Sequence, residues 1–178
     1  MNYRRAFVQN SCVHIVIVSY LRKSIFIDNI DVLRLAFKNT LKNYKFEIIA
    51  ACVLPNHVHM IIQPEKIEEY PKIISSIKHC FSRNVRQTCS THDIAYGYSN
   101  KREKGIFQRR YFEHTIKDEN DLNKHLDYIH YNPVKHGCAK TVKEWKYSSF
   151  HKFVKNGLYD TTWGNNDDIK DIINFDFE

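Results

Sequence analysis

The stretch "KFEIIAACVLPNHVHMIIQP", residues 45–64, is the clearest structural signal in this sequence. Two apolar runs, 45–54 and 57–64, flank Pro55 and Asn56, a pair typical of tight turns. This pattern predicts an antiparallel β-hairpin. The second run carries His57 and His59. Because residues i and i+2 of a strand point to the same face, both imidazoles are expected to leave the sheet side by side.

Segments on either side of the hairpin alternate between strand and helix patterns. Residues 12–20, "CVHIVIVSY", predict a first strand, and residues 28–44 carry apolar side chains mostly at helical spacing. A second helix is expected over 71–87, with Pro71 at its start, and a fourth strand over 105–116. The order predicts an α+β fold of the ferredoxin-like split βαβ type, with a central antiparallel sheet and helices packed mainly on one face.

The remaining segments are predicted to form two helices and a loop. Residues 117–132 predict a third helix, with Asp118 as its N-cap and acidic residues in its first turn. A short helix is expected within 148–157. The polar segment 88–105 is weakly patterned and is expected to be a loop.

Charge divides the chain into two parts. Residues 160–178 hold six acidic side chains and one lysine, a net charge of −5, so residues 1–159 carry +12 of a total of +7. We therefore expect a domain over 1–159 followed by an acidic tail over 160–178. A body this basic attracts polyanions, with nucleic acid the first candidate.

Several classes of protein are disfavoured by the sequence. No apolar run approaches the roughly 20 residues of a membrane-spanning helix, and no secretory signal is evident, so a cytoplasmic location without membrane contact is expected. The five cysteines are scattered without a C-x-x-C pair, which argues against a disulfide framework or a cysteine-based zinc site. No phosphate-binding G-x-x-x-x-G-K-[ST] loop occurs, so no nucleotide cofactor is expected.

A second group of polar side chains lies on the predicted third helix. Tyr128 and Asn132 are four residues apart and so share one helix face. A tyrosine offers a phenol that can attack phosphorus, and an amide carbonyl offers a hard oxygen ligand. Together with the two imidazoles of His57 and His59, that oxygen would leave open positions on an octahedral divalent ion.

Other interpretations of these residues stay open on the pattern alone. A single H-x-H on a strand is a weak signal, and the chain has eleven tyrosines, among them the adjacent Tyr131. Four further histidines could substitute as ligands, although surface or capping roles are the simpler expectation for them: His14, His125, His130 and His136.

Four ordered motifs carry a resemblance to a known family. They are "LPNHVHMII", "GIFQRRYFEHTIKDENDL", "HLDYIHYNPVKHG" and "WKYSSFHKFVKNGLY", and together they resemble the REP-associated tyrosine transposases. That family belongs to the single-tyrosine HUH endonucleases, named for a histidine–hydrophobic–histidine motif that His57-Val58-His59 fits. The resemblance covers roughly residues 2 to 164 and excludes the acidic end.

The resemblance implies a specific chemistry. His57 and His59 would bind Mg²⁺ or Mn²⁺, and Asn132 would complete the metal site. Tyr128 would attack single-stranded DNA near hairpin-forming palindromic repeats, forming a 5′-phosphotyrosine link and releasing a 3′-hydroxyl. Strand transfer would reverse this step with another 3′-end. The implied protein is a metal-dependent DNA endonuclease and strand transferase that acts as a monomer or a homodimer.

The DNA-binding surface is marked by charge. The segment from Lys78 to Arg110 contains eight basic and two acidic residues, with aromatic residues interleaved. This composition is suited to binding single-stranded nucleic acid. The residues expected to contact DNA are Arg4, Arg5, Lys78, Arg83, Arg86, Arg109 and Arg110. A solvated basic face with its aromatic residues in the core is the alternative.

Two rival functions remain at this stage. A non-catalytic, domesticated protein would hold DNA hairpins without cutting them. A metal hydrolase using His57 and His59 to activate water would leave no covalent adduct and would tolerate Tyr128→Phe. Cleavage of DNA would distinguish the implied endonuclease from the first rival, and a covalent adduct would distinguish it from the second.

Overall fold

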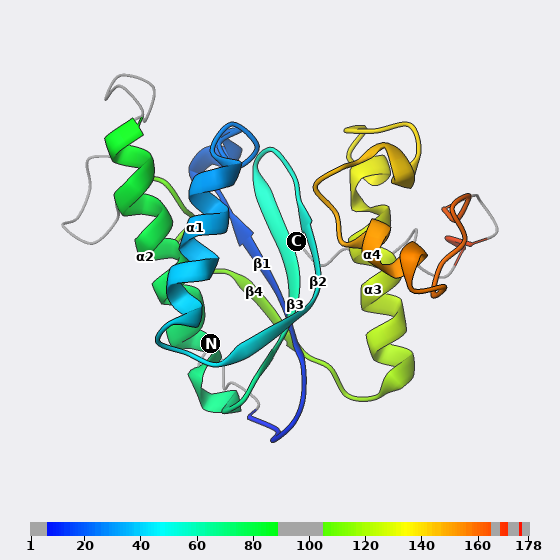
Figure 1. Cartoon of the computed structure of the whole chain (residues 1–178), viewed down its shortest axis with the longest axis horizontal. Coiled ribbons are helices and arrows are strands. Elements are labelled where there is room, and N and C mark those ends of the chain that lie inside the picture. The colour runs from blue at the N-terminus through cyan, green and yellow to red at the C-terminus, as the bar shows by residue number, and fades with distance from the viewer. Residues whose placement is uncertain (1–6, 89–104, 165–167, 171–174, 176–178) are drawn as a thin grey trace.

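The computed structural model describes residues 7–88, 105–164, 168–170 and 175. At its centre lies a four-stranded antiparallel sheet with strand order β2-β3-β1-β4 (Figure 1). The strands are β1 (Val13–Val18), β2 (Phe46–Val53), β3 (His57–Pro64) and β4 (Phe112–Thr115). Insertion of β3 between β1 and β2 is the mark of a split βαβ unit, so the predicted fold class is confirmed.

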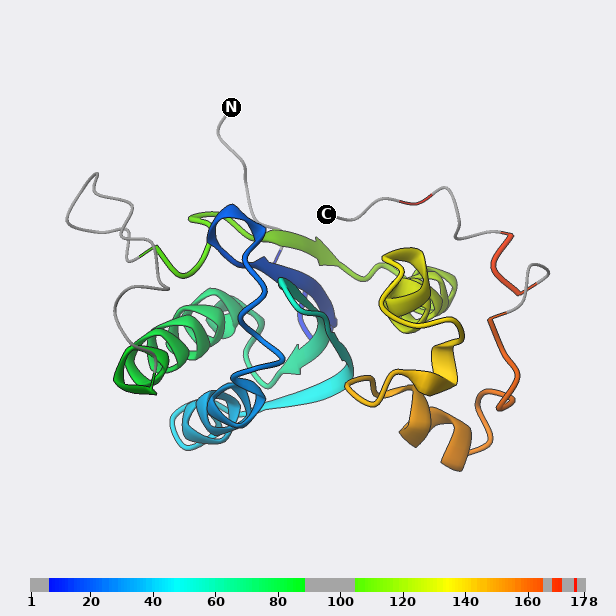
Figure 2. The same cartoon turned by 90° about the horizontal axis from the view of Figure 1, so that it is seen from above.

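Helices cover both faces of this sheet. On one face lie α1 (Ile30–Leu41) and α2 (Tyr70–Thr88), and on the other lie α3 (Glu119–Lys135) and α4 (Phe150–Lys155), with the sheet between them (Figure 2). Single turns of 3₁₀ helix occur at Tyr20–Arg22, Ile67–Glu69 and Val142–Glu144. The expected one-sided packing describes α1 and α2, whereas α3 and α4 occupy the opposite face.

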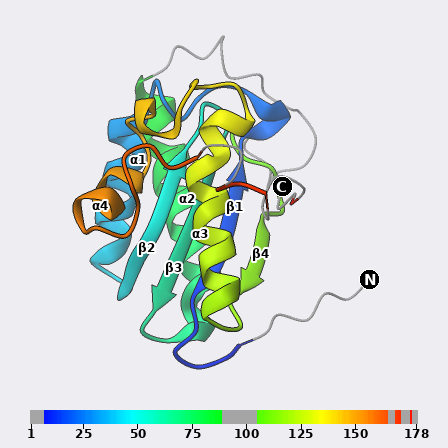
Figure 3. The same ribbon diagram turned by 90° about the vertical axis from the view of Figure 1, so that its right-hand side faces the viewer.

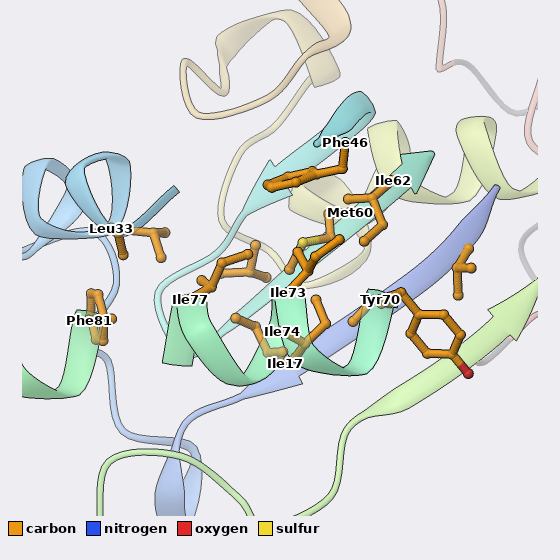
Figure 4. Close-up of a cluster of buried hydrophobic side chains, with 14 of the residues drawn as sticks. Ile17, Leu33, Phe46, Met60, Ile62, Tyr70, Ile73, Ile74, Ile77 and Phe81 are labelled. Carbon is orange, nitrogen blue, oxygen red and sulfur yellow. The ribbon is translucent and has the colours of Figure 1, made fainter. Parts of the chain in front are cut away.

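The larger core lies between the sheet and the first two helices. On α2, Ile73, Ile74 and Ile77 are fully buried against Met60 and Ile62 of β3 (Figure 4). Burying a large aliphatic side chain contributes roughly 1.5–3 kcal/mol, so this face supplies much of the stability. It also fixes which face of β3 is left for other side chains.

A smaller core joins α3 to the sheet. Leu126 and Ile129 of α3 pack against Ala50, Cys52 and Ile61, and Figure 3 shows the helix lying across this face of the sheet. These contacts hold α3 over β2 and β3.

The outer edge of β2 is covered by the segment that precedes α4. The backbone nitrogen of Val53 donates to the Tyr147 carbonyl at 2.9 Å, and that of Ser149 donates to the Ala51 carbonyl at 2.8 Å. Trp145 adds a bond from its indole nitrogen to the Val53 carbonyl at 2.9 Å. An edge strand satisfied in this way is protected from pairing with another chain.

Two expected segments differ from what the structure shows. The fourth strand is confined to Phe112–Thr115, because Arg109 and Arg110 upstream are exposed and only Phe107 makes a bridge, to Ser19. The predicted loop falls mainly on residues 89–104, outside the described residues.

The chain continues to pack beyond the expected domain boundary at residue 159. Gly164 has φ of +107°, and a Cβ there would lie 2.7 Å from Val142 Cγ2, so only glycine fits. Its backbone nitrogen donates to Asp168 at 2.9 Å, and Ile169 is buried. The division at 159/160 stays a prediction.

Two simpler expectations concern cysteines and membranes. The described cysteines are all free thiols: Cys12, Cys52, Cys80 and Cys138. Among the described residues, every helix is too short or too polar to cross a lipid bilayer.

Candidate active site

Strand β3 presents the two histidines to α3. His57 and His59 are buried at 1% and 0% exposure, while Val58 lies in the core on the other face, as the alternation predicts. His59 lies opposite Val16 of β1 and Cys52 of β2. Because β3 is paired on both sides, the imidazoles start from a fixed backbone.

Helix α3 supplies the tyrosine and the amide. Its first turn is capped as predicted, with the Asp118 carboxylate accepting from the Asp121 nitrogen at 2.8 Å. The helix does not stop at Asn132 but continues through Pro133 to Lys135. Tyr128, with 2% of its surface exposed, and Asn132, with none, both belong to its buried face.

The strand and the helix bring these side chains together. The Tyr128 ring centroid lies 5.6 Å from that of His59, which lies 4.9 Å from that of His57. The ring of His136, at the C-cap of α3, lies 4.8 Å from that of His57. Tyr128 and Asn132 are four residues apart and share one face of α3, and His136 follows at its C-cap.

Hydrogen bonds leave lone pairs for a metal ion. Asn56 Oδ1 can only accept, so His57 Nδ1 donates to it at 2.6 Å and keeps its lone pair on the buried Nε2. Asn132 Nδ2 donates to the Tyr128 carbonyl at 2.9 Å. Asn132 Oδ1 is buried and accepts no hydrogen bond from the described residues. Two imidazole nitrogens and an amide oxygen fit a divalent cation.

A lysine that sequence reasoning missed adjoins the tyrosine. Lys135 Nζ donates to the Tyr128 hydroxyl at 3.0 Å and lies 4.7 Å from its ring centroid. The same ammonium donates to the Phe175 carbonyl at 3.2 Å. Lys135 follows Tyr128 by seven residues, two helical turns, a spacing that could have been used to find it.

Buried histidines extend from the site toward β4. His59 Nδ1 lies 3.3 Å from His14 Nε2, and His14 Nδ1 lies 2.8 Å from His125 Nδ1. His125 Nε2 is 3.5 Å from one oxygen of Asp121, whose other oxygen is 2.8 Å from His114 Nε2. Burial lowers the pKa of His14 well below its usual value and that of His125 to about 4.

The expectation of surface or capping roles is therefore wrong for three histidines. His14, His125 and His130 are at most 1% exposed. His130 Nε2 lies 2.9 Å from Ser149 Oγ, and burial lowers its pKa to about 3. The sequence showed these residues beside apolar neighbours but not that α3 would cover the β1 face that carries His14.

Most of the residues expected to bind DNA lie outside the group formed by the histidines, Tyr128 and Asn132. Arg83, Arg109 and Arg110 are exposed. Lys78 Nζ donates to the Gln108 carbonyl at 2.8 Å, beside a groove of about 350 Å³ that Arg109 and Tyr111 help to line. Burial lowers the pKa of Lys78.

The other residues of the predicted DNA surface lie in part outside the described residues or are buried. Arg4 and Arg5 lie outside the described residues, and of Arg86 only its place on α2 is described. Among the interleaved aromatic residues, Phe81 is fully buried in the core and has no surface for stacking on bases.

Comparison with known proteins fits this geometry. Residues 7–132 match the family described as Transposase IS200 like. A chain of Haemophilus influenzae, assigned to the REP-associated tyrosine transposases, is 44% identical over 95% of this chain and 96% of its own length. A REP-associated tyrosine transposase of Escherichia coli K12 is 34% identical over 90% and 89%.

A solved structure is similar over nearly the whole fold. It is that of a REP-associated tyrosine transposase bound to a REP hairpin, with a TM-score of 0.79 and 29% identity over 93% of this chain and 92% of the other. The chain belongs to the IS200-like transposases and, within that family, to the REP-associated tyrosine transposases.

Proposed function

We propose that this protein is a metal-dependent single-stranded DNA endonuclease and strand transferase that works through Tyr128 and cuts near hairpin-forming palindromic repeats. One observation carries the proposal: the Tyr128 ring lies 5.6 Å from the ring of His59, beside His57, although α3 and β3 are distant in sequence. A nucleophile beside a set of metal-binding donors is what transesterification of a phosphodiester requires.

The chain's own residues account for the bond changes. The Tyr128 oxygen attacks the phosphorus and loses its proton, while the bond from phosphorus to the 3′-oxygen breaks and that oxygen leaves as a protonated hydroxyl. The strand is left joined through its 5′-phosphate to Tyr128. Attack by another 3′-hydroxyl on this link reverses the step and frees the tyrosine. Because the phosphotyrosine retains the phosphoester, joining requires no nucleotide cofactor.

Two cations would stabilise the negative charge that develops during the reaction. The Lys135 ammonium, 3.0 Å from the Tyr128 oxygen, stabilises negative charge as the proton departs. Mg²⁺ or Mn²⁺, when held by His57, His59 and Asn132, would offset the charge that develops on the phosphate. The tyrosine and all of these donors come from one chain, so the proposal assigns catalysis in cis.

Support for a hairpin substrate comes from charge and from similarity. The similar solved structure is of a protein bound to a REP hairpin. In this chain, residues 1–159 carry a net charge of +12, and Arg83, Arg109 and Arg110 are exposed to solvent. Exposed arginines of this kind neutralise phosphates and release counterions. We place the reaction on DNA in the cytoplasm.

The test is a covalent adduct. A labelled single-stranded hairpin from repeats beside the gene is incubated with Mn²⁺ and resolved on a denaturing gel. We expect a protein–DNA band with the wild type and with Tyr131→Phe, and none with Tyr128→Phe or His57→Ala. Cleavage that survives Tyr128→Phe without an adduct would assign the chemistry to water and refute the proposal.

A further inference from the structure

A row of polar groups, buried except at its far end, leads away from the proposed metal site. From His59 it runs through His14 of β1 and His125 of α3 to the Asp121 carboxylate. The three histidines are at most 1% exposed. Each contact joins two ring nitrogens, or a ring nitrogen and an oxygen, so each proton position constrains the next.

The direction of donation is set at the carboxylate. Burial alone would raise the pKa of Asp121, but hydrogen bonds from His114 and from the Lys117 nitrogen leave it below its usual value. The carboxylate is therefore ionised at neutral pH and only accepts. One of its oxygens accepts from both Lys117 N, at 2.9 Å, and His114 Nε2, at 2.8 Å. The other oxygen faces His125 Nε2 and favours a proton there.

The proton on His125 Nε2 in turn decides which ring nitrogens of His14 and His59 are protonated. A neutral His125 with its proton on Nε2 carries a lone pair on Nδ1, which accepts from His14 Nδ1 at 2.8 Å. His14 then carries its lone pair on Nε2, which accepts from His59 Nδ1 at 3.3 Å. His59, donating from Nδ1, keeps its lone pair on the buried Nε2.

We propose that Asp121, acting through His125 and His14, is a positioning residue that holds His59 in the tautomer whose Nε2 can bind the metal. The inference rests on the metal site of the proposed function. It also gives His57 and His59 separate orienting partners, since Asn56 sets the tautomer of His57 locally. Outer partners of this kind commonly tune a ligand's affinity for its metal.

The isosteric substitution Asp121→Asn would reverse the donor and acceptor roles along the row. In Asp121→Asn, the oxygen that Lys117 N and His114 bind stays an oxygen, so the amide nitrogen takes the position facing His125 Nε2. That nitrogen donates, which moves the proton of His125 to Nδ1, that of His14 to Nε2 and that of His59 to Nε2. The wrong tautomer of His59 then opposes metal binding with little change of shape, as an Asp-to-Asn change does beside a catalytic histidine in serine proteases.

The matched control is Asp118→Asn. It removes the same charge from the N-terminal end of the same helix, and asparagine caps a helix about as well as aspartate. Asp118 contacts the Asp121 nitrogen and no histidine of the row in the described hydrogen bonds. Thermal unfolding of both variants shows whether either has lost its fold.

The first measurement is made without metal. Nitrogen-15 spectra of the imidazoles are expected to show His59 protonated at Nδ1 in the wild type and at Nε2 in Asp121→Asn. Mn²⁺ titration is expected to show about 10- to 100-fold weaker binding for Asp121→Asn and unchanged binding for Asp118→Asn. His59 protonated at Nε2 in the wild type would overturn the proposal.

Two further outcomes have separate meanings. Loss of a second bound Mn²⁺ in Asp121→Asn, with the first unaffected, would make His114, Asp121 and His125 a metal site in their own right and overturn the positioning role. Equal Mn²⁺ binding by wild type and His57→Ala would refute the proposed metal site instead, while the metal-free spectra would still test the row.

Discussion

The Lys135 ammonium donates a hydrogen bond to the Tyr128 hydroxyl at 3.0 Å, from two turns further along α3. A cation in contact with the phenol oxygen is placed to stabilise negative charge that develops there in a transition state. The proposed nucleophile and this cation thus belong to one helix, whereas the proposed metal ligands come mainly from β3.

Removing this cation should slow adduct formation. We expect Lys135→Met to lower the single-turnover rate about 100-fold and Lys135→Arg to retain part of it, because arginine keeps the charge with a different geometry. The measurement is the rate of the covalent band with a labelled hairpin. Lys38→Met on α1 removes an equal charge from the opposite face of the sheet, and an equal loss there would contradict the assignment.

Asn132 should contribute to metal binding through its amide oxygen. We expect Asn132→Ala to weaken Mn²⁺ binding about 10-fold, a typical loss for a group that supports a metal site. The measurement is a calorimetric titration, with Asn123→Ala, an exposed residue of the same helix, as control. Unchanged Mn²⁺ affinity in a folded Asn132→Ala protein would remove Asn132 from the ligand set.

Acid should destabilise the protein through its buried histidines. His125 has a pKa of about 4 in the folded protein, against about 6.5 when unfolded, because burial disfavours its cation. Between these values the unfolded chain binds a proton that the folded chain does not. The free energy of unfolding therefore falls as pH decreases from 6.5 to 4, by about 1.4 kcal/mol per pH unit for this residue.

Urea unfolding at several pH values measures this slope. Among the described residues, the titratable groups in contact with His125 include His14 on β1, His114 on β4 and Asp121 on its own helix. We expect a shallower slope in His125→Gln and an unchanged slope in His151→Gln, since His151 is exposed. A wild-type slope of zero across this window would show that His125 is not buried as a neutral imidazole.

Ser149 should matter for stability. Its hydroxyl accepts from the Ala51 nitrogen at 3.0 Å and contacts His130 Nε2 at 2.9 Å, so it links β2, α3 and the start of α4. Ser149→Ala removes this bond from the half-buried Ala51 nitrogen and from the buried His130 ring, and we expect a loss of about 1–2 kcal/mol in urea unfolding. Ser24→Ala, at an exposed serine, should be neutral, and equal effects would argue against the link.

The exposed arginines should govern the salt dependence of hairpin binding. We expect Arg109→Ala and Arg110→Ala each to reduce the slope of log affinity against log salt by about one. Fluorescence anisotropy at several salt concentrations measures it. Arg34→Ala is the control, because Arg34 lies on α1 in an ion pair with Asp31. Slopes equal to wild type in both variants would place the DNA elsewhere.

The sequence predicted the elements better than their contacts. Alternation along 57–64 predicted which face of β3 carries His57 and His59, because strand periodicity is a local property. The spacing of Tyr128 and Asn132 predicted their common helix face in the same way.

What the sequence lacked was the packing of α3. Burial of His14 and His125 arises only when this helix packs over the sheet. A polar residue beside apolar neighbours reads as exposed until the covering element is known. The fourth strand was overestimated because its apolar ends, around Ile106 and Phe112, are separated by exposed arginines.

Alternate residues of strand β3 face two different parts of the molecule. Val58, Met60 and Ile62 face the core under α1 and α2, while His57, His59 and Ile61 face α3. A mutational scan of these positions scored separately for protein abundance and for DNA joining should therefore sort into two sets, with the histidines failing only in joining. Insertion of one residue within the strand would exchange the two faces and fail both scores at once.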